Sequence, residues 1–218
     1  MHSTNDGLVR GGTIEDYREE MSILRGTLTS LRVLKPLLYS KIIHTGRLFE
    51  HLAQEMSSVL FCPIDGSEFE IPQHYILASY YANIGFLSIE DSIFKNNYTN
   101  DNDIQIIRRH NIIGADLMSE KGFDCIANII RRHHEKPNGT GYLKEQNIGD
   151  KLLGLLNIAD EFVEAITPSK RPEPAMVLEE ALALSFRGYD TGLLFNQNDM
   201  EKIRAIIKEY YRCFLRVQ

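Results

Sequence analysis

The chain has 218 residues, of which 43 % are hydrophobic and 25 % are charged, and this balance is typical of an ordinary globular protein. Its formal net charge of −6 argues against a general binder of nucleic-acid polymers, because such affinity comes from Lys and Arg side chains that neutralise phosphates. No apolar run reaches the roughly 20 residues of a membrane span. The three cysteines are odd in number and show no metal-like spacing, which favours a reducing compartment, so we expect a cytoplasmic protein.

Apolar residues with helical spacing run through most of the chain after a polar leader, Met1–Gly12, which we expect to be disordered. The predicted helices cover Thr13–Leu34, Leu37–Leu60, Pro72–Gly85, Asp103–Met118, Phe123–His134, Gly149–Ile166, Leu178–Phe186 and Asp199–Phe214. No segment alternates with period two for long enough to require a strand. We therefore predict one all-α domain over 13–218, a single bundle of about seven to eight helices.

The segment Gly149–Ile166 is apolar on almost every side, which predicts a helix at the centre of the bundle. Asp160 lies in the middle of this segment. A buried carboxylate without a partner is energetically costly, so Asp160 needs a cation or several hydrogen-bond donors beside it.

The stretch Arg131–Tyr142 concentrates the chemistry of the chain. His133 and His134 close a predicted helix, and the glycines at 139 and 141 form a loop that can bring backbone amides close to a ligand. By itself the His pair also suits a solvated helix end, because a cationic side chain complements the helix dipole there.

Three more polar residues, His44, His110 and Asp160, lie on other predicted helices. Imidazoles and a carboxylate that come from different helices of a bundle suit borderline metals such as Zn, Mn, Fe or Ni. Spacing along the chain leaves open whether these side chains meet.

Five segments carry a resemblance to a known family. They read H-T-G-R-L-F-E-H-L-A, A-S-Y-Y-A-N-I-G-F-L-S-I-E-D-S-I, R-R-H-N-I-I-G-A-D-L, H-H-E-K-P-N-G-T-G-Y-L and N-I-A-D-E-F-V-E-A-I-T. In order and in spacing they resemble the HD-GYP family, a branch of the HD-domain metal-dependent phosphohydrolases whose members hydrolyse cyclic di-GMP. The likeness covers about Ser40–Thr167 and implies the helical HD-domain fold.

Several positions depart from the family pattern, and they cluster at its chemistry. The His-Asp pair that gives the family its name falls on Ala82 and Asn83, so the bridging carboxylate is absent. The Lys that meets a phosphate in the family is Phe86. Further departures are Ser40, Asn138, Leu143 and Gly154. Because two-metal hydrolysis depends on both ions, the resemblance implies an absent or vestigial phosphodiesterase activity and leaves no catalytic residue to assign.

The resemblance also implies roles for the ligand-type residues that are retained. His44 and Asp160 would be the remnant of a first metal site, which we expect to be empty or weak. His110, His133 and His134 would form the second site, and three imidazoles with an open fourth position can hold a single ion. The predicted cofactor is one divalent transition metal, Fe, Mn, Zn or Ni, or none.

For a small ligand, the resemblance points to Gly139, Gly141 and Tyr142 in the loop and to Lys170 and Arg171 farther along, although Tyr142 also suits loop packing. The implied partners are cyclic di-GMP and a signalling protein. We predict a degenerate module that acts in cyclic-dinucleotide signalling through binding or protein interaction. The alternative is a mononuclear metal-dependent phosphohydrolase that uses the three histidines, and a scaffold without a small ligand is a third hypothesis.

Overall fold

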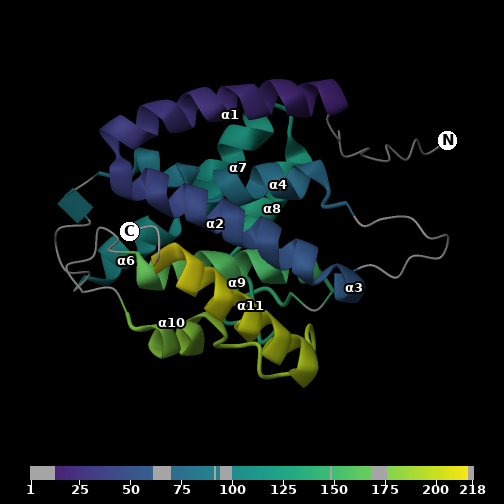
Figure 1. Ribbon diagram of the computed structural model, residues 1–218. Helices are drawn as coiled ribbons and strands as arrows, with labels where there is room; N and C mark the ends of the chain where they lie inside the picture. The colour runs from purple at the N-terminus through teal and green to yellow at the C-terminus, as the bar shows by residue number, and fades with distance from the viewer. Residues whose placement is uncertain are drawn as a thin grey trace, which may run out of the picture.

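The predicted all-α fold is confirmed by the computed structural model, which describes residues 13–60, 70–90, 92–93, 100–147, 149–167 and 176–215. Within these ranges the one extended pairing is an isolated bridge between Lys136 and Gln146. The elements shown in Figure 1 are α1 (Ile14–Leu34), α2 (Pro36–Glu55), α3 (Ser57–Leu60), α4 (Gln73–Tyr81), the 3-10 helix η1 (Ile84–Ser88), α6 (Asp101–Arg108), α7 (His110–Glu120), α8 (Asp124–Arg132), α9 (Lys151–Ile166), α10 (Leu178–Ser185) and α11 (Gln197–Leu215). The predicted leader Met1–Gly12 lies outside the described residues.

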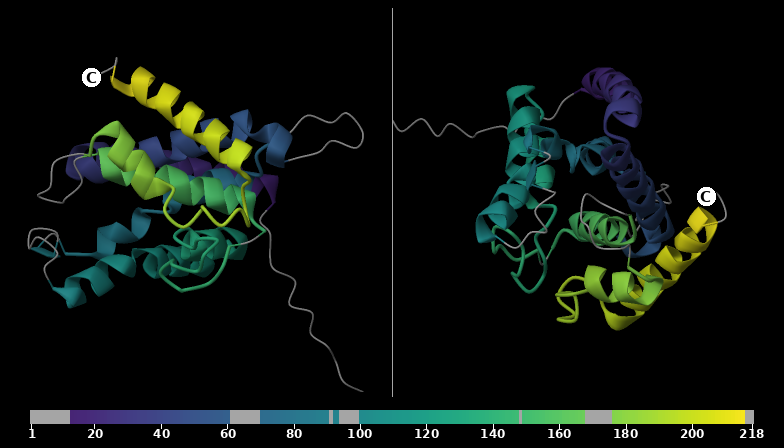
Figure 2. Two further views of the ribbon diagram at one scale, coloured as in Figure 1. Left: turned by 90° about the horizontal axis from the view of Figure 1, so that it is seen from below. Right: turned by 90° about the vertical axis from the view of Figure 1, so that its left-hand side faces the viewer.

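The helix α9 is central, as its all-round apolar pattern predicts. It packs against α2 and α10, and most of its side chains are buried. The right-hand view of Figure 2 shows α9 in the middle of the molecule, between the teal helices on one side and α10 and α11 on the other. The carboxylate of Asp160 is therefore inside the protein, with only 1 % of the residue exposed.

The helix α1 covers the bundle with a single stripe of side chains. Thr13 begins it with a capping box, in which the Thr13 hydroxyl accepts a hydrogen bond from the Asp16 N–H and the Asp16 carboxylate accepts one from the Thr13 N–H. Leu24, Leu28 and Leu31 form the buried stripe, which packs against α2 and α4. Only this face of α1 contributes to the core.

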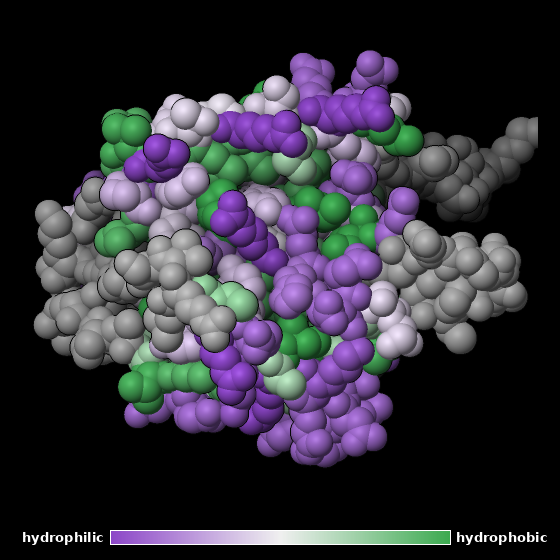
Figure 3. Space-filling model, in the orientation of Figure 1, coloured by the Kyte–Doolittle hydropathy of each residue, from purple (hydrophilic) through white to green (hydrophobic). Residues whose placement is uncertain are grey.

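Apolar side chains are also exposed where α1 meets α2. Figure 3 shows hydrophobic surface at the upper left, over this junction, where Val33, Leu34 and Leu37 are exposed. None of the helices in the described part of the chain is both long and apolar enough to cross a membrane.

Two of the predicted helices are interrupted. The segment Leu37–Leu60 is divided at Met56 into α2 and α3, and Asp103–Met118 is divided at Arg109 into α6 and α7. The second break has a local cause, because the carbonyl of Ile107 at the end of α6 faces the Nδ1 atom of His110, 2.8 Å away. His110 therefore begins a new helix instead of lying within a continuous one.

The backbone of η1 packs closely against the start of α7. A Cβ atom added at Gly85 would collide with the carbonyl oxygen of His110. We expect Gly85→Ala to lower the free energy of unfolding by about 1–3 kcal/mol, because backbone must move to relieve the collision. Urea unfolding of the metal-free protein measures this. In the control Gly26→Ala the added Cβ meets nothing within 4 Å, and helix propensity predicts a neutral or slightly stabilising change; equal losses in both variants would contradict the packing argument.

Candidate metal centre and ligand cavity

Helix ends bring three histidines together. His110 is the first residue of α7, whereas His133 and His134 directly follow α8, and α7 and α8 pack against each other. His133 caps the end of α8, and its Nδ1 atom lies 2.6 Å from the carbonyl oxygen of Ile130. All three histidines are buried, with 0–6 % exposed.

The three imidazoles face one another through their Nε2 atoms. His110 Nε2 lies 3.3 Å from His133 Nε2 and 3.2 Å from His134 Nε2. Among the described His, Cys, Asp and Glu residues, these three form the one group whose ligand atoms all lie within 4.8 Å of one another. A tetrahedral ion with metal–nitrogen bonds of about 2.0–2.1 Å separates its ligands by roughly 3.3–3.4 Å, so the spacing fits a metal ion.

Backbone carbonyls fix which ring nitrogens carry protons. The Nδ1 atoms of His110 and His133 face carbonyl oxygens, which can only accept, so each Nδ1 is the protonated donor. The Nε2 atoms of these two rings then present lone pairs to each other. Two acceptors 3.3 Å apart repel unless a cation or a donor lies between them, and this donor set therefore fits a divalent transition metal.

Burial is the largest influence on the pKa values of the three imidazoles. It lowers the pKa of His133 and lowers the pKa values of His110 and His134 well below the ordinary value. The His133 imidazole and the Lys41 ammonium lower the pKa values of His110 and His134 further. The rings are consequently neutral near pH 7, which is the form that binds metal ions.

Asp160 lies beside the cluster and is held by donors from the chain itself. Its Oδ1 atom accepts hydrogen bonds from Asn83 Nδ2 at 2.5 Å and from the Thr45 hydroxyl at 3.3 Å. Its Oδ2 atom lies 3.9 Å from His134 Nε2 and 3.7 Å from Lys41 Nζ, and has no hydrogen-bond partner among the described residues. Burial raises the pKa of Asp160, but Lys41, His133 and Asn83 together hold it below the ordinary value, so the carboxylate is ionised.

The structure does not bring His44 to this cluster. Its imidazole is half-buried, and its Nδ1 atom lies 3.1 Å from the hydroxyl of Tyr210 on α11. Lys41 and Thr45, on the same helix, are the residues that reach Asp160. His44 is thus not a member of the three-histidine group, and the metal site that it would share with Asp160 stays a prediction.

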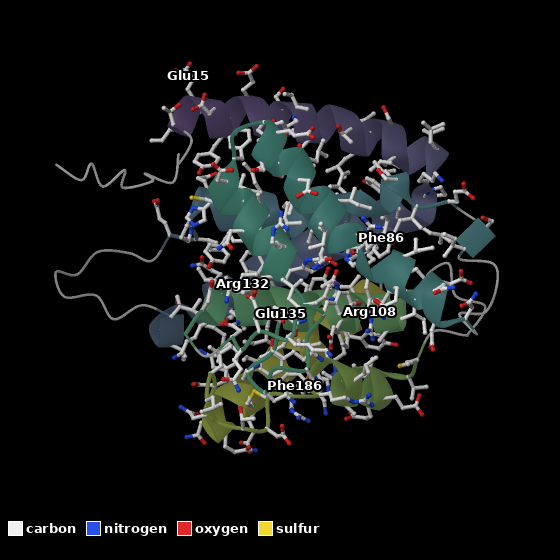
Figure 4. All side chains as sticks on the ribbon, turned by 180° about the vertical axis from the view of Figure 1, so that it is seen from behind. Glu15, Phe86, Arg108, Arg132, Glu135 and Phe186 are labelled. Carbon is white, nitrogen blue, oxygen red and sulfur yellow. The ribbon has the colours of Figure 1, made fainter. Side chains whose placement is uncertain are left out.

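Aromatic rings border the cluster. The Phe86 ring stacks on His110 with centroids 4.1 Å apart, and the Tyr142 ring stacks on His134 at the same distance. The Arg108 guanidinium lies 5.2 Å from the centre of the Tyr142 ring. Figure 4 shows Phe86, Arg108 and Glu135 toward the middle of the molecule, near the boundary between the teal helices and α9. Phe86, where the resemblance expects a phosphate-binding Lys, thus makes an apolar border.

The loop after His134 is organised by Glu135, a fully buried carboxylate. It accepts hydrogen bonds from the N–H groups of Leu143 at 2.9 Å and Glu145 at 2.8 Å. Gly141 lies so close to this carboxylate that a Cβ atom there would collide with it, and Gly139 has a positive φ of 72°. These contacts hold Tyr142 against His134.

A cavity of about 350 Å³ opens beside the histidines. Of the predicted ligand-binding residues, Gly141 and Tyr142 line it, Gly139 is not among its lining residues, and Lys170 and Arg171 lie outside the described residues. Its charged lining residues are Lys41, Lys136, Asp160, Glu161, Glu164 and Arg187. A volume near the lower end of the range for small-molecule sites, about 300–1,000 Å³, suits a ligand that is only partly enclosed.

Sequence reasoning missed several of these charged residues. Lys41 lies 2.5 Å from Glu164 Oε2, and Lys136 lies 2.8 Å from Glu161 Oε1. Glu164 is four residues after Asp160 and Lys41 is four before Thr45, so helical spacing on α9 and α2 was the signal that could have pointed to them. It was weak, because charged residues at such spacing are more often on a solvated face.

Comparisons with known proteins place these features in context. The sequence model of a family described as HD domain matches residues 33–187. The crystal structure of the HD domain of the L. monocytogenes phosphodiesterase PgpH is similar in fold, with a TM-score of 0.58 and 14 % sequence identity over 86 % of this chain and 98 % of that one. The same domain in complex with cyclic-di-AMP is equally similar, at a TM-score of 0.58 and 14 % identity over 86 % of this chain and 95 % of that one. No curated protein sequence matches the chain.

Proposed function

The chain belongs to the HD-domain family, and on that premise we propose that it is a cyclic-dinucleotide-binding module with one metal ion and impaired hydrolytic activity. We further propose that it is a degenerate member of the HD-GYP branch. The observation that carries the proposal is the convergence of three neutral, buried imidazoles at the edge of a cavity that also contains cationic and aromatic groups.

The histidine cluster supports the metal part of the proposal. His110, His133 and His134 would supply three nitrogen ligands, and Asp160 Oδ2 is the nearby carboxylate atom without a hydrogen-bond partner among the described residues. A bound divalent ion would act as a Lewis acid toward a phosphate oxygen. The carbonyls of Ile107 and Ile130 fix the orientation of two of the ligating rings.

The cavity supports an anionic ligand with flat rings. Arg187 lines the cavity and is exposed, and Arg108, also exposed, lies over the ring of the lining residue Tyr142. Guanidinium groups bind phosphates, and the Tyr142 ring, which lines the cavity beside His134 and Arg108, offers a base an aromatic edge to contact. The PgpH domain that binds cyclic-di-AMP is similar in fold, which agrees with a ligand of this class.

The proposal of impaired hydrolysis rests on the residues around Asp160. Ala82 has no ligand atom, and Asn83 uses its amide to donate to Asp160 instead of supplying a charged oxygen. Among the described residues, no carboxylate belongs to the histidine group, so nothing in it can bridge two ions. In-line displacement between two metals requires both of them to hold the attacking and leaving oxygens.

Calorimetric titration of the zinc-loaded protein with cyclic di-GMP and with cyclic di-AMP tests the binding function. We expect at least one to bind and Tyr142→Ala to weaken that binding by roughly 5- to 100-fold, because the variant loses an aromatic wall of the cavity and the ring beneath Arg108. His51→Ala is the matched control, because His51 is an exposed aromatic side chain outside the cavity and its loss should leave binding unchanged. Failure of both dinucleotides to bind would refute the module and favour the scaffold hypothesis.

The alternative of a mononuclear phosphohydrolase draws support from the open cavity beside the Nε2 lone pairs of the cluster. Incubation with cyclic dinucleotides and their linear forms, followed by chromatography of the products, separates the two functions. We expect no turnover above that of the His134→Ala variant. Turnover that His134→Ala abolishes would replace the binding module with the hydrolase.

A further inference from the structure

A buried ammonium group lines the cavity and lies between two carboxylates. Lys41 is 7 % exposed, and its Nζ atom lies 2.5 Å from Glu164 Oε2 and 3.7 Å from Asp160 Oδ2. The centre of the Phe86 ring, which stacks on His110, lies 5.1 Å from the same nitrogen atom. The ammonium is therefore enclosed by anions and an aromatic face, a setting that suits a fixed cation.

Asp160 depends on this cation. With 1 % of the residue exposed, the Asp160 carboxylate is poorly solvated and needs a compensating charge close by. Asn83 and Thr45 satisfy its Oδ1 atom, but both are neutral, whereas Lys41 is the charged group nearest to Oδ2. Removal of one partner from a buried ion pair is strongly destabilising, because the remaining charge is left without compensation.

We propose that Lys41 is a built-in cation that takes the place of a metal ion between Asp160 and Glu164, so that the domain folds without metal and binds one ion instead of two. The claim that the domain folds without metal rests on these contacts alone. The claim that it binds one ion rests also on the proposed histidine site. Lys41 is thus a positioning residue, because it acts on the site by holding Asp160.

The arrangement has a second consequence for the histidines. Asp160 Oδ2 lies between the ammonium and the cluster, 3.7 Å from Lys41 Nζ and 3.9 Å from His134 Nε2. The ammonium repels a cation at the cluster and competes for the same carboxylate oxygen. Loss of the Lys41 charge should therefore weaken the metal-free fold and at the same time strengthen metal binding, whereas simple structural damage would weaken both.

The test uses Lys41→Met, which keeps the length of the side chain and removes its charge. Without metal, we expect the melting temperature to fall by roughly 6 to 20 °C, as follows from the loss of one partner of a buried pair. The double variant Lys41→Met/Asp160→Asn should recover most of this loss, because it removes the fully buried uncompensated charge, whereas Glu164 is partly exposed to water. Zinc titration by calorimetry should give one ion per chain in the wild type and an affinity about tenfold or more higher in Lys41→Met.

Lys136→Met is the matched control. Lys136 is 8 % exposed and lines the same cavity, but its ammonium pairs with Glu161, whereas that of Lys41 lies beside Asp160. Asp160→Asn should not rescue this variant. If Lys41→Met yields no folded protein, the proposal still requires the double variant to fold.

Three results would overturn the inference. They are an unchanged melting temperature in Lys41→Met, a double variant no more stable than the single one, and zinc affinity that falls together with stability. A wild-type protein that binds no zinc would refute the proposed metal site and the count of ions, while the melting temperatures of the metal-free variants would still decide the role of Lys41.

Discussion

Replacement of His110 by alanine is expected to lower the affinity for zinc more than about 100-fold, because losing even a supporting group around a metal ligand costs 10- to 100-fold. His110 Nε2 lies 3.2–3.3 Å from the Nε2 atoms of both other histidines, so its loss removes the nitrogen ligand that is next to both of them. Zinc titration against a competing chelator measures the affinity, and elemental analysis after dialysis measures the retained ion.

The control for this experiment is His74→Ala. His74 is a partly buried histidine on α4 whose ring contacts Tyr75 and which does not belong to the cluster. Its replacement should leave zinc affinity within about twofold, whereas an equal loss in both variants would show that the cluster is not the binding site. His133→Ala and His134→Ala should each resemble His110→Ala, since a tetrahedral site with three imidazoles needs all of them.

Replacement of Glu135 by alanine is expected to lower the free energy of unfolding of the metal-free protein by about 3–5 kcal/mol, because two hydrogen bonds to a buried charged group are lost. Both N–H groups that it binds, on Leu143 and Glu145, would lose their acceptor. Urea unfolding measures the loss. Hydrogen exchange should show faster exchange at these two amides.

The matched control lies in the same loop. Glu145 is exposed, and its carboxylate pairs with Arg132 at 3.2 Å, so Glu145→Ala should cost less than about 1 kcal/mol. Comparable losses in the two variants, or unchanged exchange at Leu143 in Glu135→Ala, would contradict the view that Glu135 organises the loop that places Tyr142 against His134.

The candidate site followed from the sequence only in part. His133 and His134 stand next to each other before a Gly-rich loop, and Asp160 lies in an apolar helix, so both features were visible as local patterns. His44 was visible in the same way, yet the structure places it against Tyr210. A histidine on an amphipathic helix can face either of two neighbouring helices, and one residue of rotation, about 100°, decides which.

Lys41 and Glu135 illustrate the opposite case. Each looks like an ordinary charged residue in the sequence, because Lys and Glu mostly lie on solvated surfaces. The burial of Lys41 depends on Asp160 and Glu164, which lie far away along the chain. The burial of Glu135 depends on the path of its loop, which brings the amides of Leu143 and Glu145 to its carboxylate. Apart from the weak four-residue spacing that Lys41 and Glu164 show, such pairings leave no pattern along the chain.

The sequence by itself determined the helical class, the central place of α9 and the residue types that can bind a metal, because apolar periodicity and side-chain chemistry are local properties. Only the tertiary structure decided that the helix ends at His110 and His133 aim their Nε2 atoms at one point and that Lys41 faces Asp160. The packing of α7 on α8 and of α2 on α9 sets these distances, and packing is a property of pairs of helices that no single segment contains.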